Sequence, residues 1–140
     1  METENSLFHW KKLEAKGDDN GSLVALESNL NIDFDIKRIY YIYGTKSEFI
    51  RGKHAHKNLR QLLICVSGSC KVLLDNGNEK EVIELSKPNE GIYINDLVWR
   101  EMFDFSSDNV LLVIANNFYD EDDYIRDYED FINLVKNANN

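Results

Sequence analysis

Long apolar segments are missing from this 140-residue chain. No stretch approaches the roughly 20 apolar residues that a membrane-spanning helix needs. The first twenty residues also hold no apolar core of the kind that a secretory signal requires. We therefore expect a soluble protein that does not bind a membrane and that stays in the cytoplasm.

Proline and cysteine are scarce as well. Pro88 is the only proline, and no Ser/Gly/Pro-rich linker interrupts the chain, so the sequence indicates one domain over residues 1–140. The two cysteines, Cys65 and Cys70, flank Ser-Gly-Ser, and two thiols alone make neither a secreted disulfide scaffold nor a zinc site. We interpret them as half-buried reduced thiols.

Basic residues are outnumbered by acidic ones. The chain has 16 Lys and Arg against 25 Asp and Glu, so its formal net charge is −9. The field of such a protein repels the phosphates of nucleic acid, and we expect no nucleic-acid partner. An anionic small ligand is still allowed where a few Arg and Lys side chains converge on one pocket.

Short β-patterned runs separated by turn signals fill most of the chain. Residues 75–78, Asp-Asn-Gly-Asn, lie between two such runs and predict a hairpin, because Asn and Gly tolerate a positive φ. The predicted strands are 22–27, 36–43, 61–67, 70–74, 81–85, 91–94, 99–105 and 109–115.

The tail changes to a helical period. Apolar residues recur at helical spacing at Tyr124, Tyr128, Phe131, Ile132 and Val135. The acidic run at residues 120–123 suits a helix N-terminus and lacks the ligand spacing and central Gly of a calcium loop. We predict an all-β jelly-roll barrel over about residues 20–117 and one C-terminal α-helix over about residues 121–137.

Two of the three histidines, His54 and His56, stand two residues apart. If their segment is extended, both imidazoles project from the same face. Such a pair before an apolar strand resembles the cupin barrel, where two imidazoles, a carboxylate and a third histidine usually hold a metal. Here Gln61 stands at the carboxylate position, and Trp99 or Arg100 at the place of the third histidine. These side chains make a poor ligand set, so we expect no metal.

Two unligated imidazoles inside a barrel suit proton transfer, because imidazole acts as donor or acceptor near neutral pH. The leading class of reaction is then an epimerisation or isomerisation next to a carbonyl. Such a reaction needs a base for the carbon-bound proton, a donor for the enolate oxygen and walls that exclude water.

Nearly the whole chain resembles the cupin-type dTDP-4-keto-6-deoxyglucose 3,4-ketoisomerases of bacterial surface-sugar biosynthesis. The resemblance is carried, in order, by GSLVALE at 21–27, IKRIYYIY at 36–43, RGKHAH at 51–56, QLLICVSGSCKVLLDNG at 61–77, GIYINDLVWREMFDFSSD at 91–108 and VLLVIANNFYDEDDYIRDYEDF at 110–131. It implies conversion of dTDP-4-keto-6-deoxy-D-glucose to a dTDP-3-keto-6-deoxyhexose without a cofactor. The pathway implied is that of 3-amino-3,6-dideoxyhexoses for surface glycans such as lipopolysaccharide O-antigen.

The resemblance also implies roles for individual residues. His54 is the expected base at carbon 3, Tyr40 is expected to carry protons between the two oxygens, and His56 supports or shares this relay. Tyr40 can instead be a core-packing residue; alternation places it on one face with Arg38 and Ile42.

Further residues are candidates for binding the substrate. Arg38 and Arg51 can bind the pyrophosphate bidentately, or can be solvent-facing charges. Trp99 can equally stack on the thymine or fill the barrel. Arg100, as a buried cation at an inward position, needs a polar or anionic partner such as the sugar or its enolate. Gln61 completes the predicted binding set.

Several alternatives stay open. Asn20 stands where the family often has Arg or Tyr, which leaves the configuration at carbon 4 open, with Arg100 favouring the gluco over the galacto product. A cupin that epimerises the same sugar at carbons 3 or 5, or a non-catalytic carbohydrate-binding cupin, is the rival hypothesis. Exposed barrel edges, together with the resemblance, predict a homodimer in which an N-terminal strand crosses to the partner.

Overall fold

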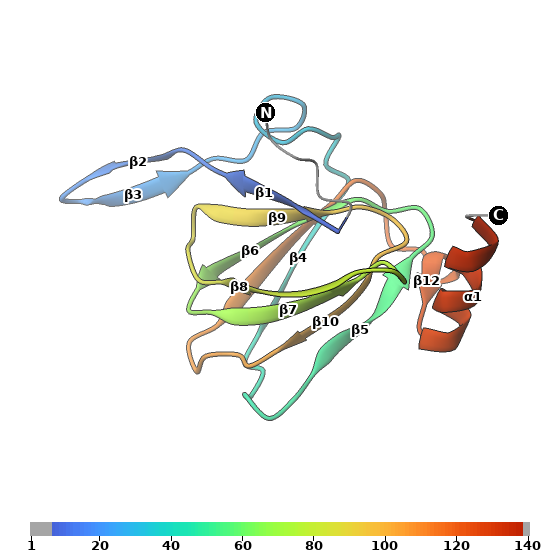
Figure 1. Ribbon diagram of the computed structural model, residues 1–140. Coiled ribbons are helices and arrows are strands. Elements are labelled where there is room, and N and C mark those ends of the chain that lie inside the picture. Colours follow the sequence, from blue (N-terminus) through green and yellow to red (C-terminus); the bar gives the residue numbers. More distant parts are fainter. Residues whose placement is uncertain (1–6, 139–140) are drawn as a thin grey trace.

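Strands make up most of the protein, as Figure 1 shows for a computed structural model that describes residues 7–138. The first six strands are β1 (His9–Lys12), β2 (Ala15–Asp18), β3 (Gly21–Val24), β4 (Arg38–Tyr43), β5 (Arg51–His56) and β6 (Gln61–Ser67). The other six are β7 (Cys70–Asp75), β8 (Lys80–Leu85), β9 (Glu90–Ile94), β10 (Trp99–Phe103), β11 (Val110–Ala115) and β12 (Tyr124–Ile125). A 3₁₀ turn at Glu121–Asp123 precedes β12, and the helix α1 (Tyr128–Ala138) follows it.

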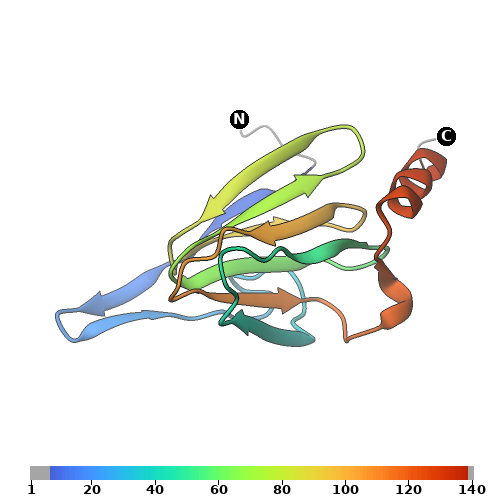
Figure 2. The same cartoon turned by 90° about the horizontal axis from the view of Figure 1, so that it is seen from below.

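Two five-stranded antiparallel sheets face each other. One has the order β1-β9-β6-β11-β4 and the other the order β12-β5-β10-β7-β8, while β2 and β3 form a separate hairpin. This hairpin projects from one end of the barrel and α1 lies at the opposite end (Figure 2). The predicted all-β jelly roll with a C-terminal helix is therefore confirmed.

The apolar strand β6 lies at the centre of the packing. Its residues from Gln61 to Cys65 are all buried, because Leu63 and Cys65 face the space between the sheets while Leu62 and Ile64 face outward under the segment that carries Ile32. A third apolar cluster lies between the second sheet and α1, where Phe131 is fully buried. The sheets thus have apolar contacts both between them and on their outer sides.

Glycine is required at one point of β5. Between β10 and β5 the register passes from Arg100↔His54 to Met102↔Arg51, so two residues of β5 lie opposite the single residue Glu101 of β10. Gly52 lies in this bulge with φ 68°, and a Cβ there would meet Met102 Cε at 2.2 Å. Only glycine adopts this backbone without strain, and the bulge sets which face of β5 carries the histidines.

The predicted hairpin at residues 75–78 is confirmed. Strands β7 and β8 pair from Cys70↔Leu85 to Asp75↔Lys80, and Gly77 between them has φ 90°. The two cysteines are free thiols, as predicted, but both are fully buried instead of half-buried.

The prediction for the tail is wrong at its start. The acidic run at 120–123 forms a 3₁₀ turn in which the Asp120 side chain accepts from the Asp122 amide, and the helix begins only at Tyr128. Tyr124 is in a strand, because β12 pairs with β5 as Tyr124↔His56 and Ile125↔Ala55. The barrel also begins earlier than residue 20, since β1 pairs with β9.

The one long helical element between residues 7 and 138 is too short and too polar to cross a bilayer.

Candidate active site

Strand β5 places both histidines of the predicted pair inside the barrel. The ring centroids of His54 and His56 are 4.8 Å apart, and the two side chains are 8% and 0% exposed. His54 is the cross-strand neighbour of Arg100 on β10. The Nε2 atoms of both rings are buried and have no hydrogen-bond partner among the described residues. The Nε2 atoms of the pair therefore keep unused hydrogen-bonding capacity in a buried position.

Three polar side chains, each from a different strand, form a hydrogen-bonded group beside the imidazoles. Arg100, which is 1% exposed, donates to Gln61 Oε1 and, at 3.1 Å, to the carbonyl oxygen of Val98. Gln61 in turn donates to the Tyr40 hydroxyl at 3.3 Å. The Nε of Arg100 is buried and has no hydrogen-bond partner between residues 7 and 138. Arg100 is thus a buried cation whose direct partners are neutral.

Two residues of the C-terminal tail, Asp123 and Tyr124, contact the imidazoles. The ring of Tyr124 lies 5.0 Å from His54 and 4.5 Å from His56, measured between centroids. The Nδ1 atom of His56 lies 2.9 Å from Asp123 Oδ2. Both residues are held beside the imidazoles by the pairing of β12 with β5.

Two more cations lie near the barrel opening. Arg38 stacks on the Tyr40 ring with its guanidinium carbon 4.5 Å from the centroid. Arg126 lies 4.3 Å over the Tyr124 ring and donates twice, each time at 2.9 Å, to the Glu121 carboxylate. The charge of Arg126 is thus offset by the Glu121 carboxylate.

Burial and neighbouring charge keep both imidazoles neutral. Burial, followed by the positive charge of Arg100, lowers the pKa of His54 to about 2 and that of His56 to about 3. Burial lowers the pKa of Arg100 to about 10, so the guanidinium stays charged at neutral pH. Burial raises the pKa of Tyr40, which therefore keeps its proton there. Neutral bases, one cation and a hydroxyl donor thus meet in one place.

Other predicted site residues lie elsewhere. Trp99 neither fills the barrel nor has a free face for thymine, because its ring packs under α1 at 5.9 Å from Phe131 and is 3% exposed. Alternation along β10 causes this, since Arg100 faces inward and its neighbour must face outward. Arg51 is exposed at the start of β5, away from the histidines that end the strand.

The described residues offer no obvious metal site. Between Leu7 and Ala138, no three His, Cys, Asp or Glu side chains are grouped so that they could hold a metal ion. Metal-free chemistry stays a prediction, which chelation tests.

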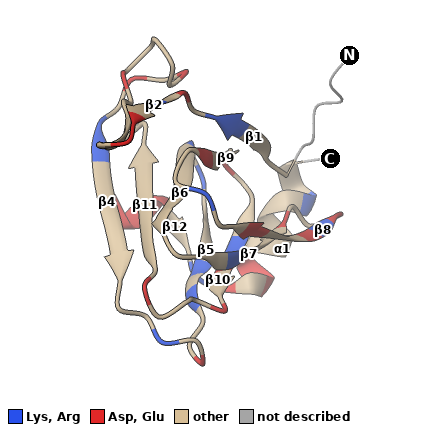
Figure 3. Cartoon of the chain, turned by 90° about the vertical axis from the view of Figure 1, so that its left-hand side faces the viewer, with Lys and Arg blue, Asp and Glu red and all other residues tan. Residues whose placement is uncertain are grey.

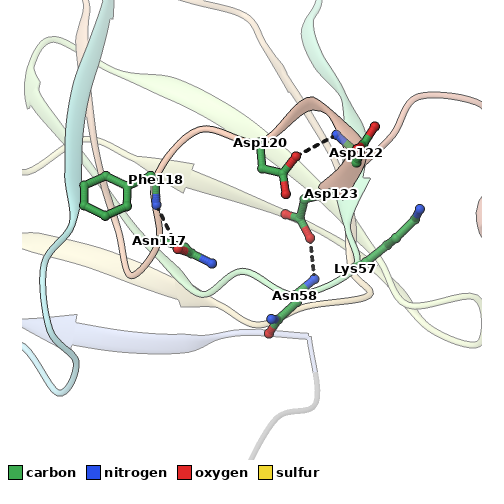
Figure 4. A pocket seen from close by; sticks show the side chains of 7 residues that line it. All are labelled: Lys57, Asn58, Asn117, Phe118, Asp120, Asp122 and Asp123. Carbon is green, nitrogen blue, oxygen red and sulfur yellow. Dashed lines mark hydrogen bonds between the residues drawn. The ribbon is translucent and has the colours of Figure 1, made fainter.

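A shallow surface pocket of about 190 Å³ lies behind Asp123 (Figure 4). It is lined by Lys57, Asn58, Asn117, Phe118, Asp120, Asp122 and Asp123. Three carboxylates against one lysine repel a pyrophosphate, so we do not place a sugar nucleotide in this pocket.

The contribution of the tail to the site does not follow from the predicted helix over about residues 121–137. That prediction places the acidic run at 120–123, with Glu121 and Asp123, and the following Tyr124 at a helix start, and it gives Arg126 no role. Asp123 is 67 residues from His56 in the chain. No local signal announces the short strand that brings them together, because two residues are too few to show an alternating pattern.

Comparisons with known proteins agree with this geometry. Residues 6–136 match the protein family described as "FdtA: WxcM-like, C-terminal". The chain is 51% identical over 136 residues to the TDP-4-oxo-6-deoxy-alpha-D-glucose-3,4-oxoisomerase of Aneurinibacillus thermoaerophilus, covering 97% of this chain and 96% of that protein.

Solved structures are similar along most of the chain. A mutant of the 3,4-ketoisomerase from Thermoanaerobacterium thermosaccharolyticum, in complex with TDP-4-keto-6-deoxyglucose, is 44% identical with a TM-score of 0.93, covering 96% of this chain and 97% of that one. The TDP-quinovose 3,4-ketoisomerase of Campylobacter jejuni is 48% identical with a TM-score of 0.86, covering 90% and 97%.

Proposed function

The chain belongs to the family described as "FdtA: WxcM-like, C-terminal", and on that premise we propose that it is a sugar-nucleotide 3,4-ketoisomerase. Its substrate is dTDP-4-keto-6-deoxy-D-glucose and its product is a dTDP-3-keto-6-deoxyhexose. The observation that carries the proposal is the pair of buried imidazoles with free Nε2 atoms beside the cation Arg100.

His54 is the proposed base. Its neutral Nε2 takes the proton from carbon 3, which the adjacent ketone acidifies, and the electron pair of that bond forms an enediolate. Arg100, whose direct partners are neutral, stabilises the negative charge on the oxygen. The enediolate thus gives the guanidinium an anionic partner in the transition state, whereas its hydrogen-bond acceptors in the described part of the chain are neutral.

Tyr40 and His56 complete the proton transfers. The hydroxyl of Tyr40 gives its proton to oxygen 4, and oxygen 3 gives its proton to His56, which passes it back to Tyr40. The protonated His54 returns its proton to carbon 4. The sugar gains and loses the same number of protons and electrons, so the ketone moves from carbon 4 to carbon 3 without an external oxidant. Gln61, which donates to Tyr40, orients the hydroxyl.

Arg38 and Arg51 are the residues that we propose for the pyrophosphate. Arg38 lies beside Tyr40 at the barrel opening, which suits a phosphate attached to a sugar held inside. Arg51 is exposed and would contact the nucleotide only at the far end of β5. We leave Trp99 out of the binding set because α1 covers it.

A single NMR experiment separates the proposal from its rivals. The protein is incubated with the 4-keto sugar in deuterated water, and carbon 3 is followed together with the position of the ketone. We expect loss of the proton at carbon 3 with migration of the ketone. Exchange or epimerisation without migration would instead indicate an epimerase, and binding without exchange would indicate a non-catalytic cupin.

The variant His54→Gln tests the base. Turnover should fall by at least about 100-fold, while affinity for dTDP, measured by calorimetry, stays close to that of the wild type. Lys53→Gln is the matched control, since Lys53 is the exposed neighbour on the same strand. A near-normal rate for His54→Gln would remove His54 from this role.

We propose the gluco configuration at carbon 4 of the product. Arg100 favours it, and the relative from Campylobacter jejuni named for TDP-quinovose, the nucleotide of 6-deoxyglucose, is 48% identical. Trapping the product with a downstream aminotransferase and measuring the H4–H5 coupling tests this. A large coupling indicates the gluco sugar, and a small coupling would indicate the galacto sugar instead.

A homodimer is the assembly that we propose. The outer face of the edge strand β4 exposes Ile39, Tyr41 and Tyr43, which are 57%, 63% and 71% exposed. Figure 3 shows β4 and β11 almost free of charged residues apart from the start of β4. The hairpin β2–β3, which projects from the barrel and exposes Leu23, is the N-terminal segment that would cross to the partner.

Sedimentation measures the proposed dimer directly. The wild type should sediment as a dimer at micromolar concentration, and Tyr41→Lys should shift it toward the monomer because a charge enters an apolar interface. Val82→Lys, on the exposed face of β8, an edge strand of the second sheet, is the control. A wild type that is monomeric under these conditions would contradict the dimer. A cytoplasmic location and a role in surface-glycan synthesis stay predictions.

A further inference from the structure

The carboxylate of Asp123 has both oxygens engaged. Oδ2 lies 2.9 Å from Nδ1 of His56, and Oδ1 accepts from the backbone amide of Asn58 at 2.7 Å, the bond drawn in Figure 4. The carbonyl oxygen of Asp123 also accepts from the amide of Lys57 at 3.0 Å. The Asp123 side chain is 15% exposed and His56 is 0% exposed. Asp123 is therefore held rigidly by the two residues that directly follow His56.

This arrangement decides which nitrogen of His56 carries the proton. A carboxylate only accepts hydrogen bonds, so the proton of the neutral ring lies on Nδ1. Burial and the three cations Arg100, Arg38 and Arg126 disfavour a second proton on the ring. The lone pair of the neutral imidazole is then on Nε2, the buried atom with no partner among the described residues.

We propose that Asp123 is a positioning residue, which fixes His56 as a proton acceptor directed into the barrel. The proposal rests on the ketoisomerase function and extends it to a residue of the tail. With the other tautomer, Nε2 would be a donor and could not receive the proton of the substrate hydroxyl. The carboxylate also holds the ring orientation, so the acceptor atom stays in place through the proton transfers.

The variant Asp123→Asn tests the tautomer with little change in shape. Its amide oxygen still accepts from the Asn58 amide, but its NH₂ group now faces Nδ1 and moves the ring proton to Nε2. We expect turnover to fall by at least about 10-fold, with the KM for the sugar nucleotide nearly unchanged because Asp123 acts through His56 in this proposal. Asp123→Glu keeps a carboxylate and should recover part of the lost turnover.

Asp122→Asn is the matched control. Asp122 belongs to the same 3₁₀ turn and is exposed, and the same charge is lost without touching an imidazole. Its turnover should equal that of the wild type. A loss equal to that of Asp123→Asn would show that the charge of the turn matters and not the hydrogen bond, which would overturn the proposal.

Long-range ¹H–¹⁵N NMR of the free protein reads the tautomer without any substrate. The wild type should show His56 protonated on Nδ1, and Asp123→Asn should show it protonated on Nε2. A wild-type ring protonated on Nε2, or on both nitrogens, would overturn the proposal even if Asp123→Asn failed to fold. So would wild-type turnover in a folded Asp123→Asn protein. Failure of the ketoisomerase function itself is distinguished by absent turnover in a wild type whose His56 is still protonated on Nδ1.

Discussion

Replacing His54 by glutamine removes one buried neutral imidazole and should change how stability depends on pH. In the unfolded chain an imidazole has a pKa of about 6.5, whereas burial and Arg100 lower the pKa of His54 in the folded protein to about 2. Below pH 6.5 the unfolded state therefore binds a proton that the folded state does not bind. The free energy of unfolding falls as the pH falls from about 6.5 toward about 2.

The size of this effect follows from the two pKa values. At pH 8 the unfolded imidazole is neutral and the contribution is negligible, at pH 6.5 it is about 0.4 kcal/mol, and at pH 5 it is about 2 kcal/mol. Between pH 8 and pH 5 these free energies depend only on protonation of the imidazole in the unfolded chain. They therefore hold for any folded-state pKa well below 5. His54 is 8% exposed, so solvent screening reduces the effect little.

Urea unfolding of the wild type and of His54→Gln at pH 8, 7, 6 and 5 measures this pH-dependent contribution of His54 to the free energy of unfolding. Carboxylates that titrate near pH 5 affect both proteins equally and cancel in the difference, and one fixed protein concentration removes the effect of assembly. The stability advantage of the wild type should shrink by about 2 kcal/mol from pH 8 to pH 5. His9→Gln, on β1 in the other sheet, is the control. A difference that stays constant to within about 0.5 kcal/mol would refute the reasoning.

Other predictions concern the bulge and the metal. Gly52→Ala should destabilise the fold by at least about 1–2 kcal/mol, because alanine is strained at φ 68° and its Cβ would displace Met102. Gly44→Ala, at φ 73° with open space around the added Cβ, should cost less, and equal losses in urea unfolding would exclude a role for the contact. Chelators should leave turnover unchanged, and loss of activity that a divalent ion restores would overturn the metal-free prediction.

Several parts of the site followed from local pattern. The two histidines were expected on one face because side chains alternate along a strand, and in β5 both rings are buried together. Arg38, Tyr40 and Ile42 were expected on one face of β4 for the same reason, and all three are less exposed than the residues between them. A period of two depends only on neighbouring residues, so it can be recognised without knowledge of the fold.

Local pattern does not say which face of a strand points inward. Trp99 and Arg100 are adjacent in β10, and the sequence predicts an inward position for Arg100 only through the resemblance to a metal-binding barrel, while it leaves Trp99 as either a barrel-filling or a thymine-stacking residue. The bulge at Gly52 and the pairing of β10 with β5 place Arg100 opposite His54 and leave Trp99 under α1. The guanidinium of Arg100 is buried between the sheets and the indole of Trp99 is buried under α1. Local propensity does not describe this choice, because it depends on how the sheets and the helix pack.

The amino-acid sequence by itself indicated eight of the twelve strands found between residues 7 and 138, namely β3, β4 and β6 to β11, and the hairpin at residues 75–78. It also indicated the shared face of His54 and His56 on the condition that their segment is extended, as β5 is. Only the tertiary structure decided that Asp123 and Tyr124 join that pair. The two-residue strand β12 pairs Tyr124 with His56, and this brings Asp123, 67 residues from His56 in the chain, beside the same imidazole. Spacing along a strand is a local property, whereas the partner of a buried imidazole depends on which distant backbone completes its sheet.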